Sequence, residues 1–105
     1  MNIELLYFEG CPSWQDARAN LMAALESLGI SSEVHQRRIE TDEEAANARF
    51  AGSPTIRVDG VDLFPVAQNQ YGLGCRIYLT PEGPRGWPTS AMLRDKLVTY
   101  LAPPP

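Results

Sequence analysis

Changes in the hydrophobic period mark the first two elements of the chain. Residues 2–8 form a short run rich in strand formers, and its last four residues are all apolar. This pattern is typical of a central strand that is covered on both faces. After a loop at 9–12 the apolar residues recur every three or four positions, which predicts an amphipathic helix from Ser13 to a C-cap at Gly29. Its apolar stripe comprises Trp14, Ala17, Leu21, Ala24, Leu25 and Leu28.

The middle of the chain predicts a polar strand, a short helix and a second apolar strand. Residues 33–39 alternate weakly and are mostly polar, which suits the edge of a sheet. Thr41 to Glu44 matches a capping box, so a short helix is expected to run from there to about Ala51. Residues 53–58 are strand-like, with Pro54 at the start, where its missing N–H does least harm.

The last part of the chain leaves two alternatives for the fourth strand. A turn is expected at Asp59-Gly60, and residues 76–79 are the first strand candidate after it. A direct hairpin into residues 61–64, followed by a long loop, is the alternative. A final helix is predicted from about Thr89, with an apolar stripe of Leu93, Leu97, Tyr100 and Leu101.

The element order β-α-β-α-β-β-α predicts an α/β fold with a mixed four-stranded sheet flanked by three helices. The first β-α-β unit requires a parallel crossover, and the later strands add to the other side of strand one. A length of 105 residues supports one core, so we expect a single domain over 1–102 and a proline tail over 103–105.

Charge and hydropathy narrow the range of partners. Nine basic against 13 acidic residues give a net charge of −4, which argues against nucleic acid and against an anionic membrane surface. The sequence has no apolar run of membrane-spanning length and no basic leader before an apolar stretch. We therefore expect a cytoplasmic protein, and nothing in the pattern indicates its oligomeric state.

Cys11 is the strongest candidate for chemistry. The two cysteines, Cys11 and Cys75, are too few for a secreted disulfide framework, so thiols are expected in a reducing compartment. Either Cys11, with Pro12 as first helical residue, or Ser13 serves as N-cap of the first helix. Cysteines at helix N-termini have pKa values of roughly 3.5–7.5, against about 8.5 for a free thiol. Cys11 is then a nucleophile at neutral pH, although a small buried apolar residue is the alternative.

The residues Leu5 to Phe8, the motif Gly10-Cys11-Pro12-Ser13-Trp14 and the later Ser53-Pro54-Thr55 together resemble the thioredoxin-like superfamily. The resemblance implies that Cys11 is the nucleophile that attacks disulfides. It also implies that Pro54 is a cis-proline packed against this nucleophile. Pro12, Ser13, Trp14, Ser53 and Pro54 would then contact the substrate. The chain is also similar to small uncharacterised thioredoxin-like proteins, some labelled by association with alkylmercury lyases.

The sequence departs from the dithiol members of that superfamily at Trp14, which stands where they have a second cysteine. A two-cysteine cycle within the motif is thereby excluded, and core packing is the favoured role of Trp14. Cys75 is the only candidate for a resolving thiol. If residues 76–79 form the fourth strand, about 3.3 Å per residue places Cys75 more than about 10 Å too far from Cys11. We therefore expect an unpaired Cys75, unless a loop over 62–74 brings it back.

Three functional hypotheses follow, none of which requires a cofactor. The first is thiol-disulfide redox chemistry through Cys11 with a small molecule or protein as partner. The second is a non-catalytic module that binds a peptide at the Pro54 edge, and the third is handling of soft metals or organomercurials. His35 is expected at the surface, and two cysteines with one histidine are too few for a structural zinc site. Glutathione binding would depend on Arg85 as an anion contact.

Overall fold

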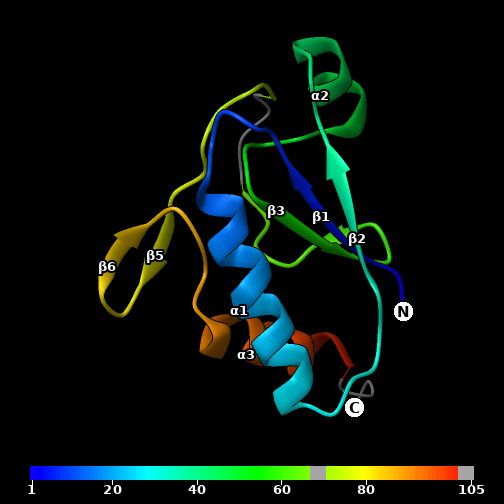
Figure 1. Cartoon of the computed structure of the whole chain (residues 1–105), viewed down its shortest axis with the longest axis vertical. Helices are drawn as coiled ribbons and strands as arrows, with labels where there is room; N and C mark the ends of the chain where they lie inside the picture. The colour runs from blue at the N-terminus through cyan, green and yellow to red at the C-terminus, as the bar shows by residue number, and fades with distance from the viewer. Residues whose placement is uncertain (67–70, 102–105) are drawn as a thin grey trace.

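The computed structural model describes residues 1–66 and 71–101. Its main sheet has four strands in the order β2-β1-β3-β4 (Figure 1). β1 (Ile3–Tyr7) is parallel to β2 (Val34–Arg38) and antiparallel to β3 (Thr55–Val58), and β3 is antiparallel to β4 (Val61–Asp62). With α1 (Ser13–Ser27), α2 (Asp42–Ala48) and α3 (Ser90–Leu101), this confirms the expected mixed sheet and three helices. Residue 102 and the predicted tail at 103–105 lie outside the described residues.

The helices cover the two faces of the sheet because the side chains of β1 alternate between them. Ile3 and Leu5 are fully buried in the larger core, which contains the apolar stripes of α1 and α3. Leu6 points to the opposite face, where it packs with Ala45 of α2 and with Phe50. β1 is therefore covered on both faces, as its apolar sequence predicts. β2 is exposed except at its first residue, which confirms a polar edge strand.

The ends of the helices follow local capping chemistry. The Thr41 hydroxyl accepts a hydrogen bond from the Glu44 amide at 3.0 Å, which confirms the predicted cap of α2. α2 ends at Ala48, earlier than expected, because Arg49 takes a left-handed conformation with φ 53°. The Thr89 hydroxyl accepts from the Met92 amide at 3.1 Å and so caps the start of α3.

The prediction that residues 76–79 form the fourth strand of the main sheet was wrong. Asp59 and Gly60 both have positive φ, 51° and 83°, the conformation of the tight turns that join adjacent antiparallel strands. The chain therefore returns at once as β4, which is the alternative hairpin. Further on, β5 (Tyr78–Thr80) and β6 (Gly83–Arg85) form a separate two-stranded sheet, which stands apart from the main sheet in Figure 1.

Candidate functional site

A disulfide joins Cys11 to Cys75, with a Cα–Cα distance of 5.9 Å across a sequence separation of 64. This contradicts the expectation that Cys75 is an unpaired thiol more than about 10 Å too far away. That distance assumed that Cys75 begins a strand of the main sheet. It lies instead on the segment that returns from the β4 hairpin, so the sequence alternative of a returning loop is the correct one.

The segment before β5 reaches Cys11 because it runs beside residues 50–53. Ser53 and Cys75 form an isolated parallel bridge. In this bridge the Ser53 amide donates to the Gly74 carbonyl at 2.7 Å, and the Arg76 amide donates to the Ser53 carbonyl at 2.8 Å. Because successive peptide groups of an extended chain point to opposite sides, the N–H and C=O of Cys75 face away from Ser53.

Gly52 permits this close approach. Its φ of 120° is unfavourable for residues with a side chain, and a Cβ at this position would lie 2.9 Å from Cγ of Arg76. A glycine is thus required where the two segments meet. Gly72 and Gly74 belong to the same contact, since the Gly72 amide donates to the Phe50 carbonyl at 3.2 Å and the Gly74 carbonyl accepts from Ser53. These glycines are the only hint in the sequence that the two segments approach each other, and they do not specify the position of Cys75.

Cys11 lies between β1 and α1, where the sequence places it. Its amide donates to the Phe8 carbonyl at 3.2 Å, which closes a turn at the end of β1. The N-cap of α1 is Pro12, with φ −69° and ψ −9°, and neither Cys11 nor Ser13 has that role. The proline ring fixes a helix-like φ, so the helical path begins one residue before Ser13. Cys11 still directly precedes the amino end of α1.

The Ser53–Pro54 peptide bond is cis, as the resemblance implied for Pro54. Ser53 and Pro54 are both buried, and the Cys11 sulfur lies 3.8 Å from the Ser53 carbonyl oxygen. A disulfide sulfur carries no proton, so this is a packing contact in the oxidised protein. The Ser53 hydroxyl is buried and has no hydrogen-bond partner among the described residues.

The two halves of the disulfide differ in exposure. Cys11 is 1% exposed, whereas Cys75 is an exposed residue. Cys75 lines an open cleft of about 360 Å³, whose walls also include Asp42, Gly52, Tyr71 and Gly74. Solvent therefore meets the disulfide from the side of Cys75.

The remaining motif residues lie at the amino end of α1 and do not line this cleft. Pro12 is exposed, and Ser13 and Trp14 are half-buried. The Trp14 ring stacks on Tyr7 with centroids 4.2 Å apart, and it packs against the larger core. This agrees with the core-packing role expected for Trp14.

Sequence reasoning missed Arg76, the residue after Cys75. Its side chain is buried and forms an ion pair with Asp62 at 2.9 Å. The guanidinium also donates to the Thr55 hydroxyl at 3.3 Å and to the Phe64 carbonyl. Arg76 therefore fastens the cysteine-bearing segment to β3 and β4. A single arginine before the apolar residues 77–79 is the only signal for this role in the sequence.

Tyr78 forms a second link to the cis-proline. Its hydroxyl donates to the Pro54 carbonyl at 2.5 Å, and its ring lies 4.9 Å from the Arg76 guanidinium carbon. Burial raises the pKa of Tyr78 well above its usual value, with a smaller opposing effect from Arg76. The folded protein therefore stabilises the neutral form of the Tyr78 side chain.

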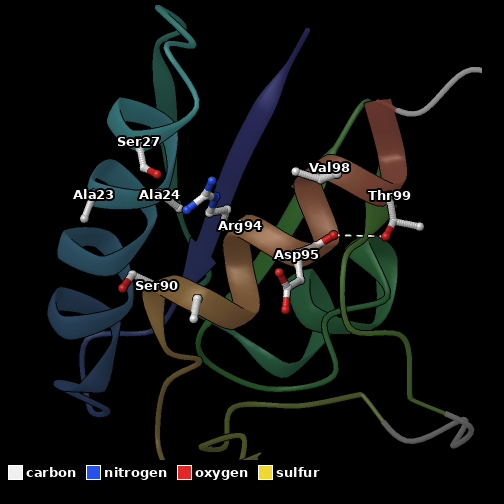
Figure 2. Close-up of a pocket in the computed structure, with 9 residues that line it drawn as sticks. Ala23, Ala24, Ser27, Ser90, Arg94, Asp95, Val98 and Thr99 are labelled. Atoms are coloured by element: carbon white, nitrogen blue, oxygen red, sulfur yellow. Dashed lines mark hydrogen bonds between the residues drawn. The ribbon is translucent and has the colours of Figure 1, made fainter.

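A larger cavity, of about 630 Å³, lies between α1 and α3, away from the cysteines. Figure 2 shows that two small residues of α1, Ala24 and Ser27, lie on the side of the helix that faces Arg94 of α3. The carbonyl of Asp95 accepts a hydrogen bond from the Thr99 hydroxyl at 3.0 Å within α3. The cavity contains no cysteine or histidine, so the candidate chemistry lies outside it.

Other candidate groups are not brought together. His35 is exposed, as expected, and lies on β2 opposite Glu4 of β1. Residues 1–66 and 71–101 contain no cluster of three or more His, Cys, Asp or Glu side chains that could hold a metal ion. None of the helices in these ranges is long and apolar enough to cross a membrane.

The candidate functional site is thus a pair of cysteines, 11 and 75, beside a cis Ser53–Pro54 bond and the buried Arg76. Two thiols at this distance can be oxidised to a disulfide and reduced again, which transfers two electrons. In comparisons with known proteins, no family model, no curated protein and no solved structure matches the chain.

Proposed function

We propose that this chain is a thioredoxin-like thiol-disulfide oxidoreductase that uses Cys11 and Cys75 as its redox pair. The observation that carries the proposal is the disulfide between Cys11, just before α1, and Cys75. Cys75 forms a bridge with Ser53, whose peptide bond to Pro54 is cis. A second cysteine from a distant segment supplies the partner that the Cys11-Pro12-Ser13-Trp14 motif lacks.

The thioredoxin-like assignment rests on the order and pairing of the elements. β1-α1-β2 followed by α2, β3, β4 and α3 agrees with the expected order, and the cis-proline immediately precedes β3, as the resemblance implies. The β5–β6 hairpin is an addition that carries Cys75 on its amino-terminal side. The motif residues that the resemblance assigns to substrate contact, from Pro12 to Trp14, stay a prediction.

The proposed cycle transfers two electrons. Oxidation of the dithiol by a partner disulfide forms the Cys11–Cys75 bond, and the partner leaves as two thiols. Reduction by external thiols reverses this reaction. In the reducing cytoplasm expected from the sequence the pair would rest as thiols, and the disulfide would be the oxidised half of the cycle.

The two alternatives draw less support. A peptide-binding module at the Pro54 edge would use the Ser53 backbone, but its N–H and C=O are already bonded to Gly74 and Arg76. Metal handling would use the reduced pair, since two adjacent thiolates can bind a soft ion such as Hg(II) or Cu(I). No additional ligand cluster among the described residues favours it.

The experiment is a turnover assay with dithiothreitol as reductant and a self-quenched fluorescent derivative of glutathione disulfide as substrate. We expect wild-type protein to accelerate reduction of the probe, and Cys11→Ser and Cys75→Ser each to be slower than wild-type protein, because each lacks the second thiol of the redox pair. His35→Ala, an exposed change outside the site, is the matched control and is expected to keep it. Equal rates for wild-type protein and both cysteine variants would refute the proposal.

A further inference from the structure

We infer that Cys75, and not Cys11, is the sulfur that forms the mixed disulfide with the partner. This rests on the proposed function, and it reverses the roles that the motif around Cys11 suggests. It also assigns the partner a chemical class: a thiol or disulfide without negative charge near its sulfur.

Cys11 is buried, which restricts the approach of a partner thiol to its sulfur. In thiol-disulfide exchange the incoming thiolate approaches one sulfur from the side opposite to the sulfur that leaves, so it needs access to the attacked atom. Cys11 is 1% exposed, and its sulfur lies 3.8 Å from the carbonyl oxygen of the buried Ser53. A thiolate from solvent is therefore kept from the Cys11 sulfur.

The surroundings of Cys75 have the opposite character. The residue is exposed and lines an open cleft in which three neighbours, Gly52, Gly72 and Gly74, have no side chains to block approach. The N–H and C=O of Cys75 also point away from Ser53, so an extended peptide could pair with them while its own cysteine reacts. Both the access to Cys75 and the orientation of its backbone groups therefore favour Cys75 as the residue that reacts with the partner.

The exchange balances as follows. A partner thiolate attacks the Cys75 sulfur and forms a mixed disulfide, while the Cys75–Cys11 bond breaks and its electron pair leaves on Cys11. The new Cys11 thiolate lies at the amino end of α1, where the helix dipole favours an anion. A second partner thiolate then attacks the partner sulfur of the mixed disulfide, which releases the Cys75 thiolate and an oxidised partner. In the reverse direction Cys75 attacks and Cys11 resolves.

The charge of the cleft indicates which thiols it favours. Among the described residues that line it, Asp42 is the only charged one. The guanidinium of Arg76, the residue after Cys75, is already paired with Asp62. A carboxylate in the same cleft as the reacting sulfur repels anionic thiols and attracts cationic ones, by up to about a few-fold in rate at an exposed site.

The first experiment compares the two single variants with the neutral probe 4,4′-dithiodipyridine. We expect the remaining Cys75 of Cys11→Ser to react on the order of tenfold or more faster than the remaining Cys11 of Cys75→Ser. Equal or faster reaction of Cys11 would overturn the inference.

Because removing one cysteine could open the site, a second measurement uses the oxidised wild-type protein. It is mixed with cysteamine, quenched in acid and digested with trypsin, which separates Cys11 on peptide 1–18 from Cys75 on peptide 58–76. An adduct on Cys75 is expected. An adduct on Cys11 together with reversible reduction refutes this inference alone, whereas a disulfide that no thiol reduces refutes the proposed function as well.

The charge preference has its own matched variant. The reduction rate by cysteamine is divided by the rate by 3-mercaptopropionate, and each rate is normalised to the same thiol acting on glutathione disulfide. We expect a ratio above one for the wild-type protein and a lower ratio for Asp42→Asn. A ratio at or below one, or one that Asp42→Asn leaves unchanged, would contradict the assigned partner class.

Discussion

Reduction of the Cys11–Cys75 disulfide is expected to lower the stability of the fold by about 4 kcal/mol. The bond closes a loop with a sequence separation of 64. In the chain-entropy model a crosslink over about 64 residues removes about 14.5 cal/mol/K from the unfolded chain, which is about 4.3 kcal/mol at 25 °C. This corresponds to a change of about a thousandfold in the unfolding equilibrium constant.

The variant Cys75→Ser isolates the effect of the crosslink. Cys75 is exposed, so the change to serine removes little packing, whereas a substitution of the buried Cys11 would also alter the core. Reduced wild-type protein and Cys75→Ser should therefore have equal stability within about 0.5 kcal/mol. Both should unfold well before the oxidised wild-type protein.

The assay is urea unfolding followed by the fluorescence of the two half-buried tryptophans, Trp14 and Trp87. With a slope of about 1–3 kcal/mol/M, the loss of the crosslink lowers the midpoint by at least about 1 M. A difference below about 1 kcal/mol between oxidised and reduced protein would show that the bond does not constrain the unfolded chain. A reduced protein less stable than Cys75→Ser by more than about 1 kcal/mol would contradict the assignment of the whole effect to the crosslink.

Three further changes test the structure around the disulfide. Arg76→Met should cost about 3 kcal/mol of unfolding free energy, because it leaves the Asp62 carboxylate without its buried partner; Asp62→Asn is its companion. The unfolding free energy of the wild-type protein should fall above about pH 10, by up to about 1.4 kcal/mol per pH unit, because Tyr78 ionises in the unfolded chain whereas burial raises its pKa in the folded protein and keeps it neutral. Tyr78→Phe should remove this contribution to the pH dependence. Thr41→Ala should cost about 1 kcal/mol by removing the cap of α2. Urea unfolding measures all three, the second as a function of pH in the oxidised protein.

Each of these has a contrary outcome. A cost below about 1 kcal/mol for Arg76→Met would mean that the ion pair does not hold the segment. If the unfolding free energy falls equally with alkaline pH in Tyr78→Phe and in the wild-type protein, groups other than Tyr78 cause the fall. An unchanged unfolding free energy in Thr41→Ala would indicate that the first turn of α2 has another capping group.

The elements with strong periodicity could be predicted from the sequence. The apolar run of β1 and the stripe of α1 leave one arrangement that buries both, and the Thr41 cap marks the start of α2 directly. The position of Cys11 follows from these local patterns because it lies between two predicted elements. The cis form of Ser53–Pro54 was implied by the resemblance and not by the residues alone.

The position of Cys75 could not be predicted because it depends on contacts between distant segments. A tight turn at Asp59-Gly60 leads directly into β4, which has only two residues. The segment 72–76 then lies beside residues 50–53. The contact then needs Gly52, the Ser53 backbone and the Arg76–Asp62 pair at once. None of these has a periodic signature, so distance reasoning along a supposed strand gave the wrong result.

The most direct test of the central claim is a redox titration of the wild-type protein in buffers of reduced and oxidised dithiothreitol. The fraction of Cys11–Cys75 disulfide is measured at equilibrium by alkylation and mass spectrometry. We predict a reversible two-electron transition that is the same when approached from the oxidised and the reduced side and that both cysteine variants lack. Two cysteines that remain alkylated as separate thiols in every buffer would contradict the account.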